Sequence, residues 1–121
     1  MTRSLVHHRT TAFSHQSGRC HYCELPMWLD DPAEFTEKYR ISSGKARLLR
    51  CTAEHLVARQ DGGSDSSSNI VAACWFCNSR RHRRKVAPSP DLYKLRVRKR
   101  INQGRWHQFT DPIGLLTADR G

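Results

Sequence analysis

Two Cys-x-x-Cys pairs constrain the folding of this 121-residue chain more than any other feature of its sequence. Cys20 and Cys23 form the first pair, and Cys74 and Cys77 form the second, with 50 residues between the pairs. Two residues between cysteines let both thiolates reach one tetrahedral ion, and four thiolates close the coordination shell of a structural Zn²⁺. We therefore predict one structural zinc site built by both pairs, with disulfides or a chance pattern as the alternatives.

A zinc site would matter to so small a chain because its apolar core is expected to be small. Only 37% of the residues are hydrophobic, and the mean hydropathy is −0.72. Metal binding would add directly to folding stability. The length predicts a single domain, residues 1–121. The fifth cysteine, Cys51, is expected to be a buried thiol on a strand, with a spare ligand or a reactive cysteine as the alternatives.

The charge of the chain favours a polyanionic partner. Lys and Arg number 21 against 11 Asp and Glu, which gives a net charge of +10 and a pI near 10.1. Such a balance is typical of nucleic-acid binding, although a solvated basic surface is the alternative. Residues 1–13 lack the apolar run of a secretory signal, and no stretch resembles a membrane span. We therefore expect a cytoplasmic protein with reduced cysteines and no membrane partner.

The expected elements are two short strands with helices around them. The strands are expected at 46–53 and 69–73, joined by a polar loop at 59–68 with Gly62 and Gly63 as its turn. Helices are expected near 10–16, 33–40, 75–86 and 91–103, with Ser42 to Gly44 ending the second. The core is expected at about 20–86, with 24–50 as an insertion. Residues 89–121 are expected to form a basic C-terminal helix and tail, with Trp106, His107 and Phe109 packing back on the body.

An ordered set of residues between the two cysteine pairs resembles the HNH endonucleases. Glu54-His55 comes first, then the Gly62-Gly63 loop, then Asn69 at the start of a strand, then Cys77-Asn78 at the start of a helix. The resemblance covers about residues 20–86. It implies an α+β fold with a ββα-metal (HNH, His-Me finger) core, and metal-dependent hydrolysis of phosphodiester bonds in DNA.

The same residues can be interpreted from their chemistry. Histidine titrates near neutral pH, so His55 is the candidate general base that takes a proton from water. Glu54 and Asn78 would supply oxygen ligands to a hard divalent cation, which stabilises the charge on the phosphate. Asn69 would bond backbone across the loop and hold His55 in position. The resemblance implies the same four roles for the matching residues.

Two features bear on which metal ion binds and which residues are its ligands. The family most often has Asp where this chain has Glu54, so the metal position could shift. His82 lies four residues after Asn78, on the same face of a regular helix, and is an additional or alternative ligand. An oxygen-only set favours Mg²⁺ or Mn²⁺, whereas a set with His82 tolerates Zn²⁺, Ni²⁺ or Co²⁺ better. Asn69 and Glu54 also have an alternative interpretation without a role in the site. Asn69 would then be a simple turn residue, and Glu54 would be a solvated strand residue.

Two clusters of cations are expected to bind phosphates of DNA. The first cluster comprises Arg80, Arg81, Arg83, Arg84 and Lys85, and the second comprises Arg96, Arg98, Lys99 and Arg100. No base-reading motif is evident, so weak sequence preference is expected. One ββα site cuts one strand, so a double-strand break would require a homodimer or successive nicks. The rival interpretations are a non-catalytic zinc-stapled module that binds nucleic acid, a subunit of a larger DNA-processing complex, and an RNA nuclease.

Overall fold

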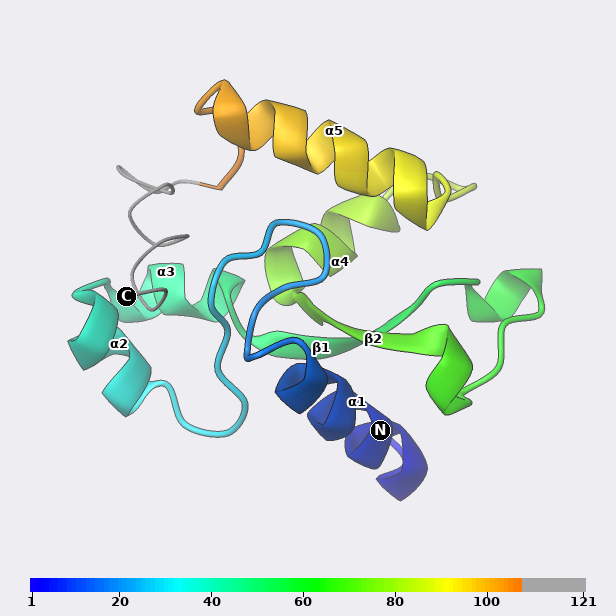
Figure 1. Cartoon of the computed structure of the whole chain (residues 1–121), viewed down its shortest axis with the longest axis horizontal. Coiled ribbons are helices and arrows are strands. Elements are labelled where there is room, and N and C mark those ends of the chain that lie inside the picture. Colours follow the sequence, from blue (N-terminus) through cyan, green and yellow to red (C-terminus); the bar gives the residue numbers. More distant parts are fainter. Residues whose placement is uncertain (108–121) are drawn as a thin grey trace.

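A computed structural model describes residues 1–107 and shows a two-stranded antiparallel sheet surrounded by helices (Figure 1). The α+β class is therefore confirmed. Phe109 lies outside the described residues. The elements, in chain order, are α1 (Arg3–His15), α2 (Ala33–Tyr39), α3 (Ser43–Leu48), β1 (Cys51–His55), the 3-10 turns η1 (Arg59–Asp61) and η2 (Ser67–Asn69), β2 (Ile70–Cys74), α4 (Trp75–Arg81) and α5 (Pro90–Asn102).

The strands β1 and β2 form a hairpin whose long connection carries both 3-10 turns. The register pairs Cys51 with Cys74 at one end and His55 with Ile70 at the other. Helix α4 follows β2 without a loop, because Cys74 caps it: the Cys74 Sγ accepts a hydrogen bond from the Cys77 backbone N–H. The order β1, β2, α4 is the ββα arrangement that the sequence predicts.

Helix α1 packs against the hairpin and is longer than predicted. It begins at Arg3 because the Thr2 hydroxyl accepts a hydrogen bond from the Leu5 N–H, 3.1 Å away, which satisfies a backbone group at the helix start. Just beyond the helix, the Gln16 side-chain amide bonds the backbone N–H and carbonyl of Ala72, at 2.9 and 2.8 Å. This side chain takes the place of a neighbouring strand beside β2.

The insertion contains a helix, α3, part of which was expected to be a strand. Residues 46–48 belong to α3, and only the second half of the predicted strand 46–53 is extended. Ser42 to Gly44 start this helix and do not merely end the one before it, because the Ser42 hydroxyl accepts a hydrogen bond from the Lys45 N–H at 3.2 Å. Ala46 and Leu49, both fully buried, are three residues apart, which places them on one face of a helix but on opposite faces of a strand.

Helix α4 is five residues shorter than the predicted 75–86 and ends at Arg81. The Arg81 side chain explains this end, because its Nε donates to the carbonyl of Pro88 at 3.1 Å and draws the following chain into a turn. Ser89 then caps α5 by accepting a hydrogen bond from the Leu92 N–H. The predicted C-terminal helix is confirmed within one residue at each end.

The core lies where the cysteine pairs, the hairpin and α5 meet. Its fully buried members include Tyr22, Leu25, Leu49 and Val97. Among residues 1–107, no helix is long and apolar enough to span a membrane.

Candidate functional site

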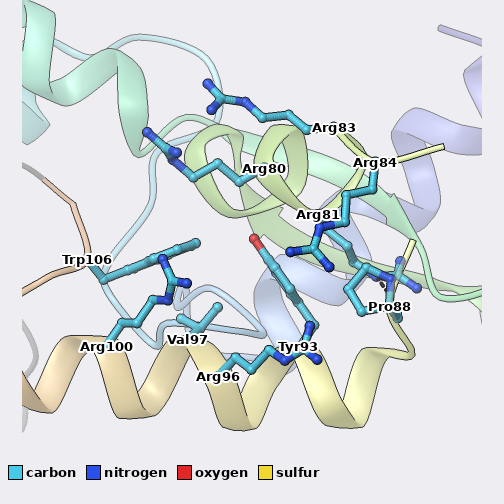
Figure 2. Close-up of a pocket in the computed structure, with 10 residues that line it drawn as sticks. All are labelled: Arg80, Arg81, Arg83, Arg84, Pro88, Tyr93, Arg96, Val97, Arg100 and Trp106. Atoms are coloured by element: carbon cyan, nitrogen blue, oxygen red, sulfur yellow. Dashed lines mark hydrogen bonds between the residues drawn. The ribbon is translucent and has the colours of Figure 1, made fainter. Parts of the chain in front are cut away.

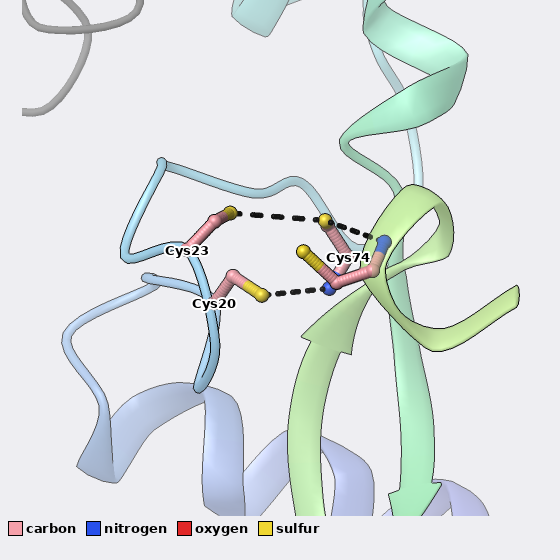
Figure 3. Close-up of side chains that lie close together, drawn as sticks. Cys20, Cys23 and Cys74 are labelled. Atoms are coloured by element: carbon pink, nitrogen blue, oxygen red, sulfur yellow. Dashed lines mark hydrogen bonds between the residues drawn. The ribbon is translucent and has the colours of Figure 1, made fainter. Parts of the chain in front are cut away.

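The four cysteines of the two pairs form one buried cluster (Figure 3). Their sulfur atoms all lie within 4.8 Å of one another, and the Cys23 and Cys74 sulfurs are 3.9 Å apart. Zinc–sulfur bonds of about 2.3 Å in a tetrahedron would place the sulfurs about 3.8 Å apart, so the donor set fits Zn²⁺. The cluster can therefore hold the structural metal ion that the sequence predicts.

The ionisation of the thiols also suits a cation. Burial alone would raise the pKa of Cys20, but hydrogen bonds from the other three thiols lower it well below its usual value. Burial raises the pKa of Cys23 and Cys77 well above the usual value. A bound cation would favour the ionised form of all four thiols. Cys51 lies outside the cluster, and burial raises the pKa of its thiol to about 12.

Helix α5 and the residues after it form a second layer around Cys77. The indole Nε1 of Trp106 donates to the Cys77 sulfur at 3.3 Å, and the Tyr93 hydroxyl donates to the Cys77 carbonyl at 2.6 Å. His107 stacks on Phe76, with ring centroids 4.4 Å apart. Trp106 and His107 therefore pack back on the body as predicted.

Glu54 is the centre of a separate polar network at the end of β1, and it is only 1% exposed. Its Oε2 accepts hydrogen bonds from the Tyr22 hydroxyl at 3.0 Å and from Arg81 Nη1 at 3.2 Å. Its Oε1 lies 2.8 Å from His82 Nε2. Two ligands at right angles on one divalent ion, with bonds of about 2.1 Å, lie about 3 Å apart. The spacing of Glu54 Oε1 and His82 Nε2 is therefore that of a hydrogen-bonded pair and would also suit two neighbouring ligands of one cation.

Asn78 lies beside this pair on α4. Its Nδ2 donates to the Thr52 hydroxyl at 3.0 Å and to the Ala53 carbonyl at 3.3 Å. Because the amide nitrogen is fixed on β1, the Oδ1 is the atom that remains for a metal ion. Asn78 lines the same pocket as Glu54, His55 and His82, so the chain offers oxygen and imidazole donors together.

His55 occupies the last position of β1, with its side chain 15% exposed. Its Nε2 lies 2.7 Å from Asp65 Oδ1. Arg59 holds the same carboxylate with two hydrogen bonds, of 3.2 and 3.0 Å. The hydrogen bond to His55 and, secondly, the contacts with Arg59 lower the pKa of Asp65. His55 Nδ1 has no hydrogen-bond partner within residues 1–107, so this nitrogen can accept a proton.

Asn69 closes the loop that carries Asp65. Its Oδ1 accepts from the Val57 N–H at 2.8 Å, and its Nδ2 donates to the carbonyls of Val57 and Ser64 at 3.0 and 2.8 Å. The side chain thus bonds backbone across the loop, as predicted, and its bonds go to Val57 and Ser64 and not to His55.

A pocket of about 510 Å³ collects seven of the predicted site residues. It lies between β1, the η1 turn and the chain that follows α4. The predicted site residues that line it are Glu54, His55, Asn78, His82, Arg83, Arg84 and Lys85. The pocket therefore places a candidate base, candidate metal ligands and cations side by side.

Arg81 is a correction to the expected phosphate-binding set. Its side chain is 3% exposed, and besides Glu54 it donates to the carbonyls of His55 and Leu56, each at 2.9 Å. A guanidinium so enclosed cannot reach a phosphate, and it serves to position the end of β1. In the second cluster, Arg98 pairs with Glu24 at 2.7 Å, and Lys99 lies exposed on α5.

Sequence reasoning missed three residues that shape this site. Tyr22 lies inside the first cysteine pair, and nothing in that spacing predicts its hydrogen bond to Glu54. Arg59 and Asp65 lie in a polar loop, where spacing carries no signal about which side chain meets His55. An acidic residue in the loop after the candidate base was the only available signal.

One part of the chain matches a known protein family. Residues 41–84 match the family model of the HNH endonuclease. The match covers 44 of the 121 residues, and together with the ββα order and the cysteine cluster it confirms the resemblance to the HNH endonucleases over that stretch. The match begins at residue 41, so the last part of the expected insertion 24–50 lies inside it. Neither the curated proteins nor the solved structures contain a match to the chain.

Proposed function

We propose that this protein is a divalent-metal-dependent endonuclease that nicks DNA, with His55 as the general base. The observation that carries the proposal is the pocket that holds His55, Glu54, Asn78 and His82 together. A family match alone would not distinguish an active nuclease from a binding module, whereas this combination of side chains has no evident use in binding alone.

The surroundings of His55 suit proton transfer. With Asp65 accepting the proton of Nε2, the imidazole is held in the tautomer whose Nδ1 carries the lone pair. Nδ1 then takes a proton from the attacking water, and the Asp65 carboxylate stabilises the imidazolium that results. Arg59 keeps the carboxylate in place.

The ligand set for the catalytic cation is Glu54, Asn78 and His82. Arg81 and Tyr22 fix Oε2 of Glu54, which leaves Oε1 on the side of His82. A divalent ion bound there would stabilise the charge that builds on the phosphate and on the leaving oxygen. Because one ligand is an imidazole, we expect Mn²⁺, Ni²⁺, Co²⁺ or Zn²⁺ to support activity as well as Mg²⁺.

Three exposed cations on the pocket wall would hold the DNA. They are Arg83, Arg84 and Lys85. Because such contacts displace counterions, raising the salt from about 50 to 200 mM should weaken binding by more than about tenfold. A flat salt response would contradict phosphate binding.

The test is a nicking assay on supercoiled plasmid. Wild type, His55→Ala and the control His7→Ala, which changes an exposed histidine of α1, are incubated with EDTA, Mg²⁺, Mn²⁺, Ni²⁺ or Zn²⁺. We expect metal-dependent nicking by wild type and the control but not by His55→Ala. An RNA substrate of matched sequence tests the choice of nucleic acid.

The second candidate function is a zinc-stapled binding module, on its own or as a subunit of a larger DNA-processing complex. The cysteine cluster and the basic helices would suffice for it. Salt-sensitive plasmid binding with no cutting in any metal would favour this function and exclude the nuclease.

A further inference from the structure

A second pocket, of about 230 Å³, lies between α4 and α5 and is surrounded by arginines (Figure 2). Arg80, Arg83 and Arg84 come from α4 and the chain after it, and Arg96 and Arg100 come from one face of α5. We call these five residues the arginine pocket. Arg81 also lines it, but Glu54 neutralises that side chain.

The arginine pocket lacks acidic partners. None of its five arginines forms an ion pair within the described part of the chain, and no acidic side chain lines the pocket. Five guanidinium groups around one small space repel one another, and an anion would remove that repulsion. Guanidinium groups bind phosphate oxygens in pairs, which makes a phosphate the best-matched anion.

Aromatic rings hold two of the arginines in place. The Arg80 guanidinium lies 4.2 Å from the ring centre of Phe76 and 5.9 Å from that of Trp106. Arg100 lies 5.9 Å from the Trp106 ring on the other side of the pocket, and Figure 2 shows its side chain beside the indole. The Arg80 Nε is buried without a hydrogen-bond partner. These guanidinium groups are thus ordered before a ligand arrives, which lowers the entropic cost of binding.

Two buried side chains of α5 and that of Trp106 close the inner side of the arginine pocket. Val97 is fully buried, Tyr93 and Trp106 nearly so, and the Tyr93 hydroxyl is turned away to the Cys77 carbonyl. Because these side chains form an inner wall, the pocket suits a group that projects into it, such as the phosphate at the end of a strand. A terminal phosphate also carries up to two charges against one for an internal phosphodiester.

The arginine pocket adjoins the proposed nuclease site. Arg83 and Arg84 line both pockets, so one short segment of chain separates them. A strand held in the nuclease pocket could therefore place a nearby end in the arginine pocket.

We propose that the arginine pocket binds the terminal phosphate of a nucleic-acid strand, as a phosphomonoester dianion. This proposal rests on the proposed function only for the location of the cut. It assigns the substrate class: strands with a phosphorylated end, bound so that cleavage falls close to that end.

The test measures binding of short fluorescent single strands in the His55→Ala background, where cleavage does not interfere. The strands carry a 5′-phosphate, a 3′-phosphate or hydroxyls at both ends, and mononucleotide and inorganic phosphate serve as competitors. Arg96→Ala and Arg100→Ala are compared with Lys94→Ala, which removes one charge from α5 outside both pockets.

We expect one phosphorylated end to tighten binding by at least about tenfold, the effect of one charge-assisted hydrogen bond or more. Arg96→Ala and Arg100→Ala should remove most of this gain, and Lys94→Ala should retain it. The proposal is overturned if hydroxyl and phosphate ends bind equally, or if Lys94→Ala loses the gain to the same extent. A gain that neither mononucleotide nor inorganic phosphate can compete away would also overturn it, because a pocket for a phosphomonoester must admit both competitors.

The outcome is separable from that of the nicking assay. Tighter binding of phosphorylated strands without any nicking would support the arginine pocket as a phosphate site and contradict the proposed nuclease activity. Nicking without tighter binding of phosphorylated strands would support the nuclease activity and contradict the phosphate site.

Discussion

Replacing Arg81 should lower the free energy of unfolding. Its position in a run of basic residues would instead predict a loss of DNA affinity. Its guanidinium donates to Glu54, to the carbonyls of His55 and Leu56, and to that of Pro88. Arg81→Ala would leave a carboxylate that is 1% exposed without its cationic partner. Breaking a buried ion pair from one side costs about 3–5 kcal/mol. Tyr22 and His82 still contact Glu54, so we expect a loss near 3 kcal/mol, at the lower end.

The assay is guanidinium unfolding of the zinc-loaded protein, followed by tryptophan fluorescence and circular dichroism. The matched control is Arg83→Ala, which removes the same charge from an exposed neighbour and should change stability by less than about 0.5 kcal/mol. Arg81→Lys keeps the charge but lacks the several donors of a guanidinium, so its stability should lie between those of Arg81→Ala and Arg83→Ala. A loss below about 1 kcal/mol for Arg81→Ala, or a loss of DNA affinity with full stability, would refute the structural role.

Three further predictions concern the metal cluster and the loop. Cys77→Ser should lower the bound zinc, measured by atomic absorption, and the thermal midpoint together; full zinc content would count against the four-cysteine site. Asn69→Ala should cost about 1–3 kcal/mol in denaturant unfolding, because two backbone carbonyls and one N–H lose their partner, and unchanged stability would contradict this. Asp65 has a lowered pKa, so its contribution to stability is present above the ordinary carboxyl pKa of about 3.9 and is lost as the pH falls through the lowered value. Asp65→Asn should therefore weaken the acid dependence of unfolding below about pH 4; parallel pH curves for the two proteins would show that the contact with His55 is not formed in solution.

Local patterns predicted the parts of this protein that depend on spacing. The two cysteine pairs specify one cluster because each pair brings its own thiols within reach of an ion, wherever the chain runs between them. Glu54, His55, Asn78 and His82 meet because a short hairpin followed directly by a helix leaves them little freedom. The metal ligands were therefore predictable as candidates from an ordered motif.

The parts that escaped prediction depend on contacts between distant residues. Arg81 and Arg83 look alike in sequence, yet one is buried against Glu54 and the other is exposed, which only the packing of α4 on β1 decides. Residues 46–48 lie in a short apolar run that predicts a strand, yet they belong to a helix that the Ser42 hydroxyl caps. The arginine pocket likewise needs α5 folded back on α4, which no local pattern indicates.

The placement of Cys20 and Cys23 has a consequence for how this domain can be handled. The region that carries the family match, residues 41–84, contains only half of the cysteine cluster. It also omits Tyr22, which donates a hydrogen bond to Glu54, and Trp106, which donates one to the Cys77 sulfur. The stretch by which the domain is recognised is therefore smaller than the stretch that must fold. A fragment trimmed to the match, or a chimera that grafts it elsewhere, would carry the candidate catalytic side chains without the parts that hold them in place.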